Sequence, residues 1–118
     1  MCLAICLAIF FPVNGKSQIY SASGGGLWNS GTTWVGGIVP GAADNVVITS
    51  TVSVNGNACN NINIEAGGVL RNHNANNYLL IVHGNLTNNG TISNNAGYSL
   101  SVNVVGNISN SGIMSNYA

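Results

Sequence analysis

A duplicated stretch near the C-terminal end of the sequence most constrains the fold. Residues 84–94 (GNLTNNGTISN) return 22 positions later as residues 106–116 (GNISNSGIMSN). The glycines coincide, most of the asparagines coincide, and each aliphatic residue is replaced by another apolar one. An apolar stretch precedes each copy, at residues 79–82 and 100–105. A fixed period of this length indicates a repeat architecture, in which each unit buries its apolar face by stacking on the next.

The repeated unit consists of strands rather than helices. Its apolar segments are short and are separated by Asn, Gly and Ser, as in strands joined by tight turns. Residues 45–48, 52–54, 62–64 and 69–70 have the same character, with turn signals at 55–56 and 67–68. We therefore predict an all-β fold, a single-stranded parallel β-helix (β-solenoid) with about 22 residues per turn, over residues 44–118. This segment holds about three to three and a half turns, and we expect the natural protein to continue beyond Ala118.

The composition is nearly free of charge. Only 3% of the residues are charged, the formal net charge is zero, and 46% are hydrophobic. Such a chain has no field with which to attract phosphate backbones, so we expect no nucleic acid among its partners. It is also too hydrophobic for a disordered chain.

Asparagine supplies much of the polar surface and is far more frequent than in ordinary globular proteins. Asn tolerates the left-handed backbone of tight corners, and its amide can bond to the backbone. Amides stacked in register also bond to one another. We expect Asn88 to stack on Asn110, and Asn94 on Asn116.

The N-terminal residues indicate export. Residues 2–11 form an apolar run that is too short to span a bilayer, and residues 15–17 (GKS) offer a cleavage pattern of small residues. We predict a signal peptide at residues 1–17 and a secreted, cell-surface protein without a membrane span in the mature chain. No positive charge precedes the apolar run, so a buried N-terminal strand or helix is the alternative. Removal of this segment would leave Cys59 as a single cysteine, which we expect to be a small buried residue.

Residues 18–43 are irregular and contain both tryptophans, Trp28 and Trp34. A solenoid needs a cover over its first turn, because an exposed rung would pair with other chains. We predict that residues 18–43 form an N-terminal cap built on these two rings. The alternative is a sugar-stacking platform.

Residues 28–48, with the Pro-Gly-x-x-Asp-x-Val-x-Ile step at 40–48, resemble the opening of secreted, repeat-rich surface proteins of Bacteroidetes bacteria. Residues 52–64 and 67–70 resemble the first turn of the same proteins. The resemblance implies a Trp-containing cap followed by a right-handed parallel β-helix. It also implies an exported adhesin-like protein, of a kind often secreted through a type IX sorting domain. The resemblance implies no particular activity.

The ionisable residues do not form a recognisable catalytic or metal-binding motif. Asp44 and Glu65 are separated by about one predicted turn, a spacing that could stack them near each other. Two carboxylates make a poor calcium site, and we expect Asp44 to be a turn residue and Glu65 with Arg71 a solvated pair. His73 and His83 lack ligand partners at metal-site spacing, and no nucleophile elbow is present. We therefore predict no catalytic, cofactor-binding or metal-binding residues, and no cofactor.

The function expected from these features is a non-enzymatic, exported cell-surface β-helix scaffold, adhesin-like, whose partners are glycans or neighbouring solenoid chains. The alternative is the N-terminal part of a β-helical polysaccharide lyase or hydrolase with catalytic turns downstream. Ice binding would need a regular Thr ladder. The repeat aligns Thr87 with Ser109 and Thr91 with Ile113, so we expect no such ladder.

Overall fold

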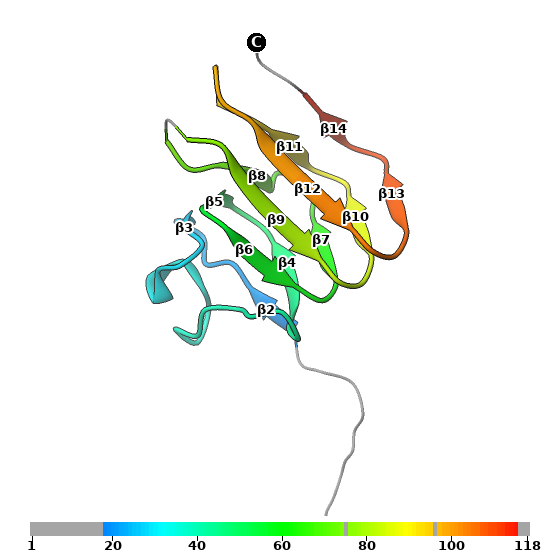
Figure 1. Cartoon of the computed structure of the whole chain (residues 1–118). Coiled ribbons are helices and arrows are strands. Elements are labelled where there is room, and N and C mark those ends of the chain that lie inside the picture. The colour runs from blue at the N-terminus through cyan, green and yellow to red at the C-terminus, as the bar shows by residue number, and fades with distance from the viewer. Residues whose placement is uncertain (1–17, 75, 96, 116–118) are drawn as a thin grey trace, which may run out of the picture.

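The computed structural model describes residues 18–74, 76–95 and 97–115, and the predicted signal peptide at 1–17 lies outside them. The described chain winds into a β-solenoid of about four turns, with three parallel sheets as its sides (Figure 1). A full turn, called a rung below, contributes one strand to each sheet. The predicted all-β parallel β-helix is confirmed.

Each sheet contains strands from successive rungs. Sheet 1 comprises β2 (Gln18–Tyr20), β4 (Asn45–Ile48), β7 (Ile62–Ile64), β10 (Leu86–Asn88) and β13 (Ile108–Asn110). Sheet 2 comprises β3 (Gly26–Leu27), β5 (Thr51–Val54), β8 (Val69–Asn72), β11 (Thr91–Ser93) and β14 (Ile113–Met114). Sheet 3 comprises β6 (Asn57–Cys59), β9 (Tyr78–Val82) and β12 (Leu100–Val104).

The strand register follows the repeat in the upper rungs but not in the lower ones. Leu86 pairs with Ile108, one full repeat later, as the duplication predicts. Below it, Val46 pairs with Ile62 after a much shorter turn, and Ile62 pairs with Leu86 after a slightly longer one. The loops between strands absorb these differences, so the sheets remain in register although the turn lengths vary.

The core is a column of aliphatic side chains along the solenoid axis. Period-two alternation turns every second side chain inward, as in β7, where Ile62 and Ile64 are buried and Asn63 between them is partly exposed. Full burial of one such side chain contributes about 1.5–3 kcal/mol. The fully enclosed aliphatic residues are Ile48, Val52, Val54, Ile64, Leu70, Leu80 and Val82.

Cys59 belongs to this core, as expected, and is fully buried. Burial disfavours the thiolate and raises the pKa of the thiol to about 12, from 9.0. Because the folded pKa is the higher one, the stability that the neutral thiol contributes is complete below pH 9.0 and is lost as the pH rises through about 12.

We therefore expect Cys59 to resist alkylation at pH 8 in the folded protein and to react once the chain is unfolded in urea. The measurement is iodoacetamide labelling followed by mass spectrometry. The test chain carries Cys2→Ser and Cys6→Ser, so that Cys59 is the only thiol. Rapid labelling of the folded chain would contradict the burial of Cys59.

The segment before β4 closes the lower end of the core. β2 and β3 pair with β4 and β5 as a partial rung (Figure 1). Trp28 and Trp34 are 0% and 2% exposed and meet edge to face, with ring centroids 5.1 Å apart. The indole N–H of Trp28 donates to the Pro40 carbonyl at 3.2 Å, and that of Trp34 to the Trp28 carbonyl at 2.7 Å. Buried, hydrogen-bonded rings suit a cap.

An asparagine ladder runs up one corner of the solenoid, where the strands of sheet 1 begin. The side-chain oxygen of Asn45 accepts the backbone N–H of Asn61 at 3.2 Å. In the same way, the Asn61 side-chain oxygen accepts the backbone N–H of Asn85 at 2.8 Å. The Asn85 side-chain oxygen accepts that of Asn107 at 2.9 Å. Each amide thus bonds to the next rung, which adds a hydrogen bond to the backbone pairing of the sheet.

The predicted Asn88–Asn110 pair is confirmed, since the Asn88 amide donates to the Asn110 side-chain oxygen at 2.9 Å. Asn116, the predicted partner of Asn94, lies outside the described residues. Among the described residues other than glycine, only Asn74 has a positive φ, of 46°. The asparagines therefore act mainly through their amides and seldom through left-handed backbone.

Three glycines stack where the chain passes from sheet 1 to sheet 2, namely Gly68, Gly90 and Gly112. A methyl group added to Gly90 would overlap the carbonyl oxygens of Glu65 and Gly68 in the rung below. We expect Gly90→Ala to lower the free energy of unfolding by about 1–3 kcal/mol, because backbone atoms of a paired rung have no room to retreat. Gly24→Ala is the control, since no atom lies within 4 Å of its added methyl. Equal denaturant midpoints for both variants would contradict this packing.

Candidate interaction surfaces

The carboxylates do not stack as their spacing in the sequence suggests. Because the first turn is short, Asp44 lies beside Asn60, whose backbone N–H donates to the Asp44 carbonyl at 2.7 Å. Glu65 lies one rung above the end of β4, where its backbone N–H donates to the Ile48 carbonyl. The expected approach of the two carboxylates is therefore wrong. The expected turn role of Asp44 is confirmed, since its carboxylate accepts the Gly41 N–H at 2.8 Å.

The other ionisable residues are also dispersed. Arg71 lies on the outer face of sheet 2, in register with Ser53 and Ser93. The ring of His73 hydrogen-bonds to the amide of Asn74 at 2.9 Å. Within the described ranges, His, Cys, Asp and Glu nowhere form a group of three that could hold a metal ion.

The tryptophans are not available as a sugar platform. A stacking platform needs an exposed ring face, whereas both rings are buried in the hydrophobic core cluster. The alternative interpretation of Trp28 and Trp34 is therefore wrong. The register also bears out the expected lack of a Thr ladder, because Thr87 pairs with Ser109 and Thr91 with Ile113.

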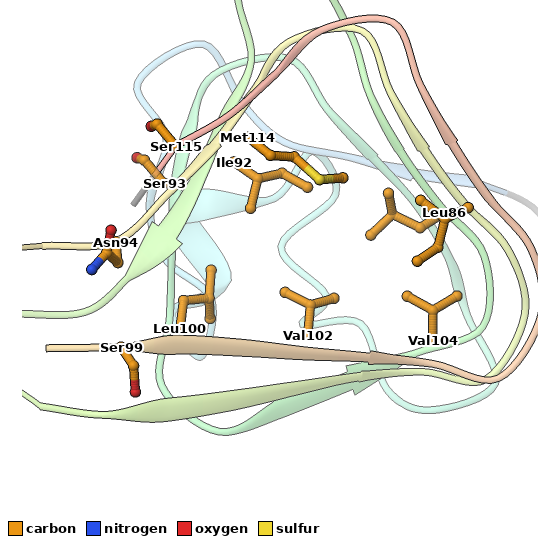
Figure 2. Close-up of a pocket in the computed structure, with 11 residues that line it drawn as sticks. Leu86, Ile92, Ser93, Asn94, Ser99, Leu100, Val102, Val104, Met114 and Ser115 are labelled. Carbon is orange, nitrogen blue, oxygen red and sulfur yellow. The ribbon is translucent and has the colours of Figure 1, made fainter. Parts of the chain in front are cut away.

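A hollow of about 340 Å³ lies at the upper end of the core. Figure 2 shows Leu100, Val102 and Val104 projecting from β12 toward Leu86 and Ile92 on the opposite side. These residues stand directly above the buried core of the lower rungs. The hollow is thus the upward continuation of the core column, and its lining is that of a core rather than of a specific ligand site.

A second hollow, of about 270 Å³, is polar and lies on the outside of sheet 1. Side chains two positions apart on one strand point to the same face. One wall is therefore formed by residues at or directly before the strand starts, and the other by Asn63 and Thr87, two residues further on in β7 and β10. We call this feature the sheet 1 groove. Its lining residues are Gln18, Asn45, Val46, Asn61, Ile62, Asn63, Asn85 and Thr87.

The sheet 1 groove presents amides and hydroxyls. Asn61 and Asn85 use their side-chain oxygens in the ladder, which leaves their NH₂ groups as donors. The side-chain oxygen of Asn63 is covered and has no hydrogen-bond partner. Tyr20 lies in the column of Asn63 at the lower end, 44% exposed, and its hydroxyl donates to Gln18 at 3.2 Å.

The sequence alone does not reveal this groove. The uncharged Asn, Ser and Thr faces are expected from composition. Aligning Asn45 with Asn61 and Asn85, however, requires the unequal turn lengths of the lower rungs. The only sequence signal is the polar residue that directly precedes the first aliphatic residue of each sheet 1 strand. Such a pattern is common in half-buried strands.

No helix among the described residues has the length and apolar character to cross a membrane. Comparison of the chain with family models, with curated proteins and with solved structures gives no match.

Proposed function

We propose that this chain is a non-enzymatic, exported β-solenoid segment that serves as a stiff, adhesin-like scaffold at the cell surface. The observation that carries the proposal is the continuity of the rungs. Sheet 1 passes through five strands without a break. The Asn45–Asn61–Asn85–Asn107 ladder crosses these strands at the corner where they begin. Such stacking resists local opening, because each interior rung is hydrogen-bonded both below and above.

The distribution of ionisable groups supports a non-enzymatic role. General acid–base catalysis needs groups within hydrogen-bond reach of one substrate. Asp44 lies at the start of the first full rung, whereas Arg71 lies on the outer face of sheet 2. The apolar run at residues 2–11 supports export.

Stiffness is tested by proteolysis. A folded rod is cleaved only through its open states, so resistance reports how rarely the rungs open. We expect residues 18–115 to survive thermolysin under conditions that degrade a Leu86→Asp variant, which places a charge in the core. Cleavage of the unaltered chain within the sheets, at the rate of the variant, would overturn the scaffold role.

Export is tested with a reporter. Residues 1–17 are fused to an alkaline phosphatase that lacks its own signal and forms its disulfides only outside the cytoplasm. We expect phosphatase activity from this fusion and its loss in a Leu7→Arg variant, in which a charge interrupts the apolar run. An inactive unaltered fusion would contradict export.

A further inference from the structure

We propose that the sheet 1 groove binds a neutral, hydroxyl-rich polymer, a glycan chain laid along the solenoid axis. The inference rests on the proposed adhesin-like function and assigns it a site. The groove crosses the strands, so residues on its walls recur from rung to rung at about 4.8 Å. One wall has such residues on four rungs and the other, with Asn63 and Thr87, on two. A long, regularly spaced ligand fits such walls better than a compact one.

The groups in the groove match hydroxyls. A sugar hydroxyl both donates and accepts, and the walls offer amide NH₂ donors on Asn61 and Asn85 and a donor–acceptor hydroxyl on Thr87. The ladder fixes the orientation of the Asn61 and Asn85 amides through bonds of 2.8 and 2.9 Å. These donors are therefore ordered before the ligand arrives, which reduces the entropy cost of binding.

Asn63 can adapt to the ligand. Its side-chain oxygen is buried without a partner, so the amide has no hydrogen bond at that atom to lose when it rotates toward a hydroxyl. Tyr20 lies two rungs below Asn63 in the same column, beyond the buried Val47, and is 44% exposed. An aromatic face packs well against the apolar C–H face of a sugar.

Other polymers fit the sheet 1 groove less well. Its lining holds no Lys, Arg, Asp or Glu, so nothing neutralises the phosphates of a nucleic acid. A peptide usually binds by adding a strand to a free sheet edge. Here the floor strands β4 and β7 are already paired on both sides, so a peptide gains no backbone bonds from them.

The test is a glycan array probed with the full chain and followed by calorimetry. The array holds neutral oligosaccharides, namely linear glucans, mannans and chitin oligomers, together with sulfated glycans and extended peptides. We expect the chain to bind at least one neutral glycan. We expect it to bind no sulfated glycan more tightly than that neutral glycan. We expect the double variant Asn63→Leu with Thr87→Val to weaken that binding at least tenfold. Thr51→Val on sheet 2 is the matched control and should bind as the unaltered chain does.

Circular dichroism and thermolysin resistance establish that each variant is folded. Preference for a peptide or a sulfated glycan, an absence of neutral glycan binding, or equal binding by the double variant would each overturn the groove assignment. If the unaltered chain still resists thermolysin, and residues 1–17 still export the reporter, the scaffold proposal stands without this site. Loss of either property in the unaltered chain refutes the scaffold itself.

Discussion

Replacing Leu86 by Ala should lower the free energy of unfolding by about 2–5 kcal/mol. Leu86 is 1% exposed and lies in the sheet 1 column between Ile62 and Ile108. The deleted atoms leave a cavity between stacked rungs, and the hydrogen-bonded strands above and below limit its collapse. Denaturant unfolding followed by circular dichroism measures the loss.

Ile108→Ala is the matched control, because Ile108 occupies the same column one rung higher but is 60% exposed. It has little burial to lose, so we expect a cost below about 1 kcal/mol. Equal losses for Leu86→Ala and Ile108→Ala would mean that the column does not extend through the rungs as described.

Replacing Trp28 by Ala should cost about 3–5 kcal/mol and uncover the first rung. Trp28 is fully buried, packs edge to face with Trp34 and bonds to the Pro40 carbonyl. Its loss empties the lower end of the core and breaks contacts of the cap with the sheets. We expect a lower melting temperature and, in light scattering, association through the newly exposed strand edges.

Two further variants separate the contributions of Trp28. Trp28→Phe keeps an aromatic ring but loses the indole N–H, and it should fall between the unaltered chain and Trp28→Ala. Val35→Ala, at a position 63% exposed in the same segment, should leave the melting temperature nearly unchanged. A Trp28→Ala protein as stable as Val35→Ala would show that the ring does not cap the core.

The upper rungs were predictable because the sequence is duplicated there. Equal spacing forces equal register, so the pairing of Leu86 with Ile108 and of Thr91 with Ile113 follows from the period of the duplication. The burial of Trp28 and Trp34 was predictable for a different reason. Two large rings in a glycine-rich segment have few places to be buried except over the open end of a solenoid.

The lower rungs were less predictable because their register depends on loop length. The first turn, from Val46 to Ile62, is shorter than the repeat, and this separates Asp44 from Glu65. The strands β2 and β3 were not expected, since segments of three and two residues carry too little alternation to stand out. The sheet 1 groove depends on both features, because its walls include Gln18 from β2 and asparagines from unequally spaced turns.

The stacking of rungs is tested most directly by NMR detection of scalar couplings across hydrogen bonds. In the structure, the backbone N–H of Leu86 donates to the carbonyl of Asn107, Ile62 to Asn85, and Val46 to Asn61, each at 2.9 Å. We predict a coupling between the amide nitrogen and the carbonyl carbon of each pair. Couplings that instead join neighbouring strands of the chain, as in antiparallel hairpins, would contradict the β-solenoid and the functions proposed for it.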